Sequence, residues 1–488
     1  MHHNLYEINT RVWLRRFGAT ATLDDVPNQY WQYLAKRGID YIWLMGIWKT
    51  VPDAVQRYAF AEDLVREYRS VLSDWMPEDV IGSPYAIDCY EPDPAVGDWE
   101  ELVRLRKRLK KLGMRLILDF VPNHFNAESH LIETYPDVFL EGKESDLVED
   151  AGTYYLPQGS TRILAHGKDP NFAAWTDTVQ VNYGHPAARI FMRQQIQKLA
   201  QYCDGIRCDM AMLPMNSVFA KTWPQHQPQL LEEFWPQAIS EIKEVYPDFL
   251  FIAEAYWDLE WELQQQGFDY TYDKRLLDRL KEGHPIPVRD HLRADLEFQS
   301  RSVRFLENHD EARILSHFHS KRTEAMALIT YTIPGMRFFN WGQWEGRRLR
   351  LPVQLGREAV EPACYCGVYS DVQVKQLNEA IQPLCRCTFS FYDRLLLVLQ
   401  QPILQRGNWT QITVPNTSES LMAWRWSLAE EHRIILVNYS DLGNAGKIDL
   451  SGYAVEMVTD EMSQQSWSVE DHFAFRLYPW QGLVLRLN

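Results

Sequence analysis

The chain has 488 residues, of which 46% are hydrophobic and 24% are charged, a composition typical of a globular protein with room for one large α/β domain and a smaller partner. Its 66 acidic and 50 basic residues give a formal net charge of −16. This acidity argues against nucleic acid as a partner, because phosphate binding needs a basic surface. No apolar run reaches the length of about 18 residues that a membrane span needs, so we also expect no membrane partner.

The N-terminal sequence and the cysteines predict a cytoplasmic protein. The first residues, MHHNLYEINTRVWL, show neither the apolar core nor the small-residue cleavage site of a signal peptide. Seven cysteines, an odd number in so long a chain, favour reduced thiols over a disulfide framework. Cys364 and Cys366 form one C-x-C pair and Cys385 and Cys387 another, but this spacing matches no standard zinc pattern. We therefore expect ordinary thiols at these positions.

Strand-like segments alternate with amphipathic helices up to about residue 340. The clearest helix pattern is WEELVRLRKRLKKLG, in which Leu102, Leu105, Leu109 and Leu112 share one stripe and Gly113 ends the helix. The stretches HPAARIFMRQQIQKLAQY and FWPQAISEIKEVYPD predict two more helices. Eight strands are predicted, beginning near Leu5, Ile39, Met114, Asp204, Phe249, Phe268, Ser302 and Gly335.

The alternation of strands and helices predicts the α/β class with a parallel sheet. Eight strands is the number that closes a (β/α)8 TIM barrel. The alternative is an open doubly wound sheet, which usually carries a G-x-G-x-x-G turn after its first strand. The corresponding stretch here, LRRFGATATLDD, has no such turn, so the barrel is favoured.

Two connections are too long for simple barrel loops, and long loops in a compact domain usually have a function. The first, between strands two and three, contains GSPYAIDCYEPDPAVGDW and few periodic features. The second predicts a small inserted domain over residues 125–180, which leaves 1–124 and 181–393 for the barrel. From about residue 394 the helical pattern gives way to strand-like runs, beginning with LLLVLQQ and ending with GLVLRLN. These runs predict a C-terminal β-sandwich domain over 394–488.

Ionisable side chains, accompanied by two asparagines, collect at the carboxyl ends of four predicted strands. In a barrel these ends converge on one mouth, where active sites lie. A single carboxylate after a strand is more often a helix cap, and a single histidine is more often structural, so the convergence is the signal. The residues are Asp119, Asn123 and His124 after the third strand, Arg207 and Asp209 at the fourth, Glu254 at the fifth, and Asn308, His309 and Asp310 after the seventh.

Paired carboxylates suit the cleavage of glycosidic bonds, in which one acts as nucleophile and the other as proton donor. Asp209 and Glu254 lie on neighbouring strands, and a separation of about 5–5.5 Å between their carboxyl groups would lead to retention of anomeric configuration. Arg207 shares a strand face with Asp209. We expect its guanidinium to lower the pKa of Asp209 and keep it ionised. We expect no such partner for Glu254, which would stay protonated.

The ordered set of motifs DFVPNH, GIRCD, FIAEAYW and FLENHD resembles the four conserved regions of the α-amylase family of glycoside hydrolases. The stretches TDTVQVNYGHP, WGQWEG and GSPYAIDCY resemble three further family motifs, so that the resemblance runs from about residue 40 to 346. Any one motif is weak, whereas the ordered set is highly specific. The resemblance implies a barrel, an inserted B domain after strand three and a C-terminal β-domain, in agreement with the pattern above.

The resemblance also implies a function and roles for residues. The expected activity is retaining hydrolysis of α-1,4 linkages in maltooligosaccharides or α-glucans through a covalent glycosyl-enzyme. Asp209 would be the nucleophile, Glu254 the general acid/base and Asp310 the third carboxylate, which holds sugar hydroxyls. The residues that would bind the substrate are Arg207, which orients the nucleophile, His124 and His309, which bind sugar hydroxyls, and Tyr85, whose ring stacks on the glucose.

Two positions bear on metal and substrate. Asn123 matches a residue that binds calcium in many family members. The sequence does not show a full calcium site, so a structural calcium stays open, and we expect the chemistry to need no cofactor. Many amylases continue the nucleophile motif with Lys-His, which contacts sugar on the leaving-group side. Here Met212 and Leu213 stand at those positions, which puts binding of a long polymer beyond the cleavage point in doubt.

Other functions are open on the same scaffold. One is a 4-α-glucanotransferase, and another is a hydrolase of a small α-glucoside. A non-catalytic amylase-like module is the remaining alternative, although such modules tend to lose a catalytic carboxylate and all three are present here.

Overall fold

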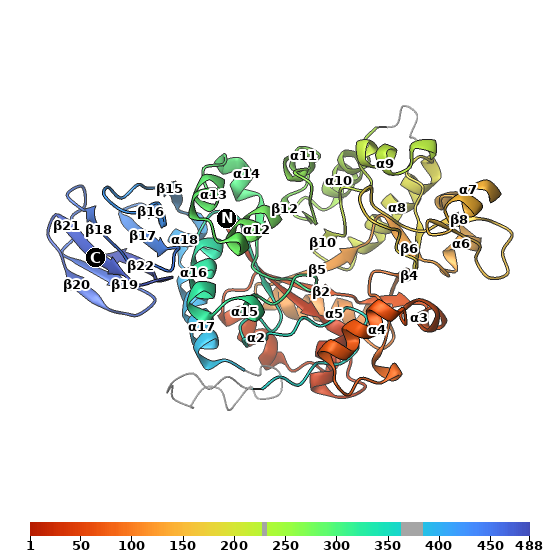
Figure 1. The fold of residues 1–488 in the computed structure, drawn as a ribbon, viewed down its shortest axis with the longest axis horizontal. Coiled ribbons are helices and arrows are strands. Elements are labelled where there is room, and N and C mark those ends of the chain that lie inside the picture. Colours follow the sequence, from red (N-terminus) through yellow and green to blue (C-terminus); the bar gives the residue numbers. More distant parts are fainter. Residues whose placement is uncertain (227–231, 363–383) are drawn as a thin grey trace.

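Eight parallel strands close into a barrel at the centre of the molecule (Figure 1), as the sequence predicts. The computed structural model describes residues 1–226, 232–362 and 384–488. Each strand pairs in parallel with its neighbours, in the order β1-β14-β13-β12-β11-β10-β5-β2. Their bounds are Asn4–Asn9 (β1), Tyr41–Met45 (β2), Arg115–Phe120 (β5), Gly205–Cys208 (β10), Leu250–Ala253 (β11), Tyr270–Tyr272 (β12), Ser302–Arg304 (β13) and Met336–Asn340 (β14).

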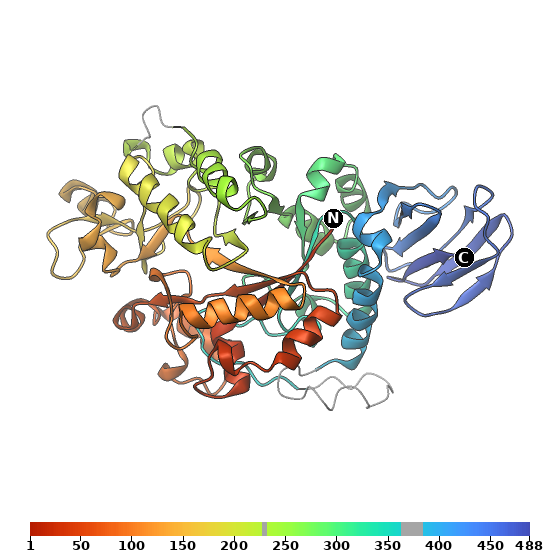
Figure 2. The ribbon, with the colours of Figure 1, turned by 180° about the vertical axis from the view of Figure 1, so that it is seen from behind.

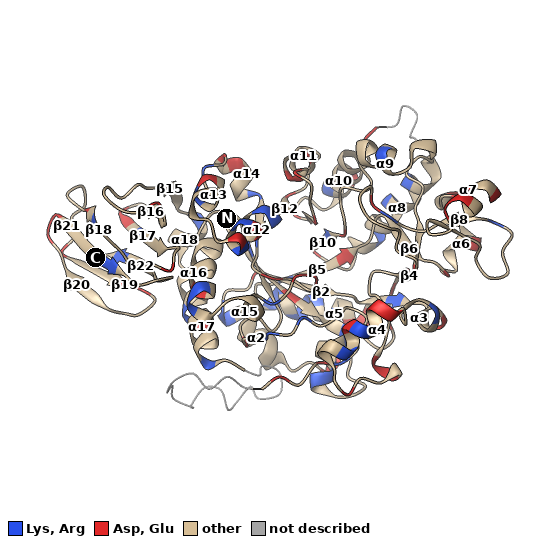
Figure 3. Ribbon diagram, viewed as in Figure 1, with Lys and Arg blue, Asp and Glu red and all other residues tan. Residues whose placement is uncertain are grey.

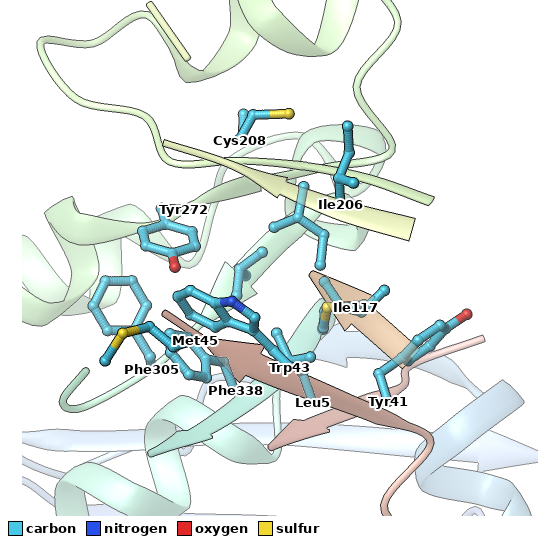
Figure 4. Close-up of a cluster of buried hydrophobic side chains, with 14 of the residues drawn as sticks. Leu5, Tyr41, Trp43, Met45, Ile117, Ile206, Cys208, Tyr272, Phe305 and Phe338 are labelled. Carbon is cyan, nitrogen blue, oxygen red and sulfur yellow. The ribbon is translucent and has the colours of Figure 1, made fainter. Parts of the chain in front are cut away.

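The barrel strands are buried on both faces because helices cover the outside and side chains fill the inside. Every residue of β2, YIWLM, is buried. Figure 4 shows how large rings fill one part of the interior, with Trp43 and Phe338 5.7 Å apart and Tyr272 and Phe305 5.1 Å apart between ring centroids. This filling makes the interior a packed core, so that the active site can form only above it.

Helix α5 (Trp99–Lys111) illustrates how the sequence specifies the outer layer. The Asp98 side chain accepts a hydrogen bond from the backbone N–H of Glu101 and so caps the first turn. Leu102, Leu105 and Leu109 are buried. Gly113 follows the helix with φ +81°, a conformation that favours glycine. The helix predicted here is therefore confirmed.

The other helices follow the strands around the barrel. Those predicted from sequence at 185–202 and 234–248 are α8 and α10. The bounds of the barrel helices are Thr10–Trp13 (α1), Asn28–Lys36 (α2), Pro186–Leu199 (α8), Asn216–Thr222 (α9), Phe234–Val245 (α10), Glu260–Gln265 (α11), Lys274–Glu282 (α12), Pro285–His291 (α13), Leu296–Ser300 (α14), Ile314–His317 (α15), Ser320–Tyr331 (α16), Arg386–Leu399 (α17) and Pro402–Arg406 (α18).

The two long connections both carry secondary structure. The first contains more regular structure than its weak periodicity suggests, namely Trp48–Thr50 (β3), Pro52–Tyr58 (α3), Glu62–Val71 (α4) and Ile87–Pro92 (β4). The second forms a small unit at the end of the molecule opposite the C-terminal domain (Figure 2), which we call the B domain. Its elements are His124–Asn126 (β6), Leu131–Thr134 (α6), Glu144–Glu149 (α7), Tyr154–Tyr155 (β7), Leu164–Ala165 (β8) and Thr178–Gln180 (β9).

The C-terminal domain consists of antiparallel sheets. A six-stranded sheet has the order β15-β16-β17-β22-β19-β20, and β18 pairs with β21 in a second sheet. Ile448, Phe473 and Phe475 of the small sheet join Leu436 and Leu485 of the large one in a shared apolar core. The strands are Asn408–Gln411 (β15), Leu421–Leu428 (β16), Glu431–Asn438 (β17), Asn444–Asp449 (β18), Met457–Asp460 (β19), Ser466–Ser468 (β20), His472–Leu477 (β21) and Gly482–Leu487 (β22).

One segment predicted as a strand of the C-terminal domain is helical. The run LLLVLQQ, from Leu395, is the end of helix α17 and the turn after it. Tyr392, Leu395, Leu396 and Leu399 are buried at helical spacing. A short apolar run cannot by itself distinguish a buried strand from a buried helix. The first C-terminal strand begins at Asn408, and the predicted domain boundaries at 125–180 and 394–488 stay predictions.

The outer surface carries mixed charge. Figure 3 shows acidic and basic residues interspersed along helices such as α4, whose sequence is EDLVREYRSV. Among the described residues, no helix is both long and apolar enough to cross a lipid bilayer.

Candidate active site

Asp209 and Glu254 are placed side by side by the register of two strands. Each is the first residue after its strand, and the preceding residues, Cys208 and Ala253, are register partners. The backbone N–H of Asp209 donates to Phe120 at 2.8 Å, and that of Glu254 donates to Cys208 at 3.0 Å. Both side chains therefore leave the barrel at its carboxyl end. They are almost completely buried, with 9% and 4% of their side-chain surface exposed.

Arg207 joins these two carboxylates. Its guanidinium, with no exposed surface, donates from Nη1 to Asp209 Oδ1 at 2.8 Å. Its Nη2 lies 2.9 Å from Glu254 Oε2, an ion pair without the alignment of a hydrogen bond. The expectation that Glu254 lacks a charged partner is therefore wrong. The two terminal nitrogens of the guanidinium contact carboxylates at the ends of two adjacent strands. The spacing of Arg207 and Asp209 within one strand does not reveal the second contact.

The environment shifts the pKa values of both carboxyl groups upward. Burial raises the pKa of Glu254 to about 7, an effect that Arg207 opposes and Asp209 reinforces. Burial also raises the pKa of Asp209, and Arg207 counteracts only part of that shift, so the expectation of a lowered value is wrong in its net direction. Asp209 still has the better-aligned contact with Arg207. We infer that the proton held by the pair resides on Glu254.

Glu254 is also held by its own chain and by the turn beyond Asp209. Its Oε2 accepts from the backbone N–H of Met210 at 2.6 Å, and its Oε1 accepts from the hydroxyl of Tyr256 at 2.8 Å. Met210 adopts φ 42°, and Trp257 adopts φ 64°, both unusual for residues other than glycine. Such backbone conformations are common where a site is held in a fixed geometry.

A second charged cluster surrounds His309. Its Nδ1 lies 2.5 Å from Glu7 Oε1, and its Nε2 lies 2.9 Å from both Asp310 Oδ2 and the Tyr85 hydroxyl. Burial acts to lower the pKa of His309, but Asp310 and Glu7 together raise it well above its usual value. Partial burial acts to raise the pKa of Asp310, but the neighbouring His309 brings that pKa below its usual range. Asp310 keeps 50% of its side-chain surface exposed and so faces the mouth of the barrel.

The structure brings the seven predicted site residues into one connected group. Tyr85 links the two clusters, because its ring lies 5.3 Å from the Arg207 guanidinium and stacks on His309 with 5.3 Å between ring centroids. His124 contacts the backbone of Tyr85, and burial lowers its pKa to about 3, so it presents a neutral imidazole. The ring of Trp175, from the B domain, lies 5.2 Å from that of His124.

Comparison with known proteins agrees with this arrangement. The family model described as alpha amylase, catalytic domain, matches residues 23–347. The chain belongs to the α-amylase family. It is 23% identical over 271 residues to the α-amylase MalA of Haloarcula japonica, a match that covers 54% of this chain and only about a third (36%) of that relative.

Solved structures of α-amylase family proteins share the fold over nearly the whole chain. A maltogenic α-amylase, AmyB, from Thermotoga neapolitana superposes with a TM-score of 0.67 at 19% identity, covering 99% of this chain and 98% of that one. A debranching enzyme from Nostoc punctiforme gives a TM-score of 0.65 at 16% identity, covering 99% and 98%. At these identities the likeness establishes the α-amylase fold.

Several residues of this α-amylase family site were not predicted from the sequence. Glu7 could have been found from the sequence, because it is a charged residue within the apolar strand LYEIN and a buried carboxylate needs a partner. Asp119, which was placed at a strand end without a role, lies 3.7 Å from Arg207, and burial raises its pKa to about 6. Trp43 and Tyr272, whose rings lie 5.1 and 5.8 Å from the guanidinium, had no signal beyond their apolar strands.

The positions that depart from the α-amylase Lys-His pattern face inward. Met212 and Leu213 are 0% and 2% exposed, respectively. They belong to the apolar core, and neither can present a polar group to a sugar. The departure seen in the sequence is therefore also structural, because both side chains lie in the core.

Two places could be considered for a metal. Asp88, Cys89 and His130 bring ligand atoms within 4.8 Å of one another. Asp88 Oδ1 already accepts hydrogen bonds from His130 Nδ1 at 2.8 Å and from its backbone N–H at 3.1 Å. This group is therefore explained as a fold-stabilising contact. The oxygens of Asn123 form the second place, which is considered below, and Cys364 and Cys366 lie outside the described residues.

The Tyr256 hydroxyl provides a test of how Glu254 is positioned. Donation to the carboxylate favours its ionised form, so Tyr256→Phe should raise the pKa of Glu254. A hydrogen bond to a charged group contributes about 1.5–3 kcal/mol and a neutral one about 0.5–1.5 kcal/mol, and this difference of about 1–1.5 kcal/mol corresponds to roughly one unit of pKa. Glu254 would then stay protonated to higher pH, so a basic limb of the kcat/KM profile that reports the titration of Glu254 should move upward by that amount.

The matched control is Tyr155→Phe, which removes a hydroxyl that donates to Ala127 in the B domain. This variant should keep the parental pH profile. A basic limb in Tyr256→Phe that stays in place or moves to lower pH would show that the hydroxyl does not act on Glu254.

Proposed function

We propose that this protein is a retaining α-glucoside hydrolase that cleaves α-1,4 linkages of maltooligosaccharides or α-glucans. The observation that carries the proposal is the pair Asp209 and Glu254, at adjacent strand ends, sharing one buried guanidinium. Family membership supports a glucan substrate. The free thiols of Cys89, Cys203 and Cys208 support the cytoplasmic location that we include in the proposal.

In the proposed mechanism Asp209 attacks the anomeric carbon while Glu254 protonates the leaving oxygen, and the covalent intermediate is then hydrolysed with Glu254 as base. A pKa of about 7 for Glu254 supports its role as proton donor, because it keeps a substantial protonated fraction near neutral pH. Asp310 is half exposed beside His309, which supports its proposed role of holding sugar hydroxyls. Arg207 orients Asp209, and Tyr85, His124 and His309 complete the proposed sugar site.

The charge balance of the site supports a cationic transition state. Arg207 and His309 face the carboxyl groups of Glu7, Asp119 and Asp209, together with Glu254 and Asp310. With Glu254 protonated as the proton donor, four carboxylates face two cations in these contacts. Preorganised negative charge stabilises the oxocarbenium-like transition state of glycoside cleavage.

Substitution of the two central carboxyl groups tests the assigned roles. Glu254→Gln should lower kcat on natural substrates by about 10²–10⁴-fold, because it removes general acid catalysis. On an activated substrate, whose leaving group needs no proton, the loss at the glycosylation step should be much smaller. Asp209→Ala should lose activity on both substrates by orders of magnitude. The fold of each variant is checked by circular dichroism, and near-parental turnover in either would refute the assignment.

The anomeric form of the product tests the proposed double displacement. Two inversions restore the original configuration, so the new reducing end should appear first as the α-anomer. A proton NMR time course early in the reaction, before mutarotation, measures this directly. A β-anomer formed first would contradict a covalent mechanism through Asp209.

The buried positions of Met212 and Leu213 predict a preference for short substrates. A hydrogen bond to a charged group contributes about 1.5–3 kcal/mol, or roughly ten- to a hundredfold in kcat/KM. Its loss weakens binding of sugars beyond the scissile bond and leaves the proposed glucose site intact. Efficiency per bond should therefore be higher on maltotriose and maltoheptaose than on soluble starch. A steep rise of kcat/KM with chain length would show that other residues, such as Trp175, replace the missing contact.

A further inference from the structure

Three oxygen atoms at the junction of the barrel and the B domain converge on one side-chain nitrogen. Gln180, the last residue of β9, has no exposed surface. Its Nε2 lies 2.9 Å from Asn123 Oδ1, 3.1 Å from the Asn123 backbone oxygen and 2.9 Å from the Val181 backbone oxygen. The backbone N–H of Lys168 donates to Gln180 Oε1 at 3.3 Å, which fixes the direction of the carboxamide.

Clustered oxygens of this kind are the ligands that calcium prefers, usually six to eight of them at about 2.3–2.6 Å and with carboxylates among them. The residues present here do not fit such an ion. The three oxygens are neutral, and the side-chain partners of Asn123 within the described parts of the chain are Gln180 and His124, neither of which is a carboxylate. An ion at their centre would displace the amide and leave its buried N–H groups unsatisfied, which is costly.

We propose that the Gln180 carboxamide takes the place of a metal ion at Asn123, so that the barrel and the B domain are joined here without calcium. The amide hydrogens provide the partial positive charge that the three oxygens require. His124 and Gln180 are register partners in the β6–β9 ribbon, so the same contact fixes the strand that carries a residue of the site. The inference concerns stability and is independent of the proposed function.

The experiment compares thermal unfolding in EDTA and in millimolar calcium chloride for three proteins. The wild type should unfold at the same temperature in both. The variant Gln180→Glu has a side chain of nearly identical shape but turns a carboxylate toward the three oxygens. In EDTA it should therefore unfold several degrees below the wild type. Because the carboxylate completes a cation site, calcium should restore much of this loss, and equilibrium dialysis should show one more bound calcium per chain than in the wild type.

Gln180→Met is the matched control, since it keeps the size of the side chain but has neither donor nor charge. It should be destabilised to a similar degree in EDTA and in calcium. The proposal is overturned if the wild type unfolds at a lower temperature in EDTA than in calcium, or if Gln180→Met is as stable as the wild type. The second outcome can be measured even if Gln180→Glu fails to fold, and none of these readouts depends on catalytic activity.

Discussion

The arrangement at the mouth of the barrel depends on the fully buried guanidinium of Arg207. An isolated charge in a protein interior is strongly unfavourable, and removing one partner of a buried ion pair typically costs about 3–5 kcal/mol. Arg207 meets this requirement with Asp209 and Glu254 in contact, Asp119 nearby and three aromatic rings around it. The need to pair this charge fixes the positions of β5, β10 and β11 relative to one another. The strand ends that carry the proposed chemistry are therefore held by electrostatics as well as by packing.

The cluster around His309 solves the same problem at the opposite side of the barrel. Glu7 from β1 and Asp310 from the loop after β13 both contact the imidazole, so a cation joins the first strand of the chain to the seventh strand of the barrel. Half of the Asp310 side chain is exposed to solvent. Its contact with the buried His309 restricts the motion of the carboxylate more than contacts with water alone would. Tyr85 lies between the two cations, and its ring contacts both of them.

Much of this arrangement could be predicted because it depends on local pattern and chain order. Apolar residues repeat every two positions in strands and every three to four positions in helices, so the order of strands and helices can be predicted. That order places residues such as Asp209 and Glu254, which follow strands, at one end of a barrel. Contacts that depend on reach across space could not be predicted in this way. The second nitrogen of Arg207, the pairing of Glu7 with a residue about 300 positions away and the amide of Gln180 all depend on side-chain direction after folding. The helix at Leu395 was missed because five consecutive apolar residues fit a strand as well as a helix.

The turn after Asp209 shows how the site and the core constrain each other. Met210 adopts φ 42°, and this turn directs its N–H back to Glu254 Oε2. A non-glycine residue in this conformation costs about 1–3 kcal/mol and persists only where the surroundings enforce it. Here the next residues supply that force, because Met212 and Leu213 are buried in the core and anchor the turn. The apolar sequence DMAML thus gives this turn a buried anchor and holds in place the N–H group that donates to Glu254.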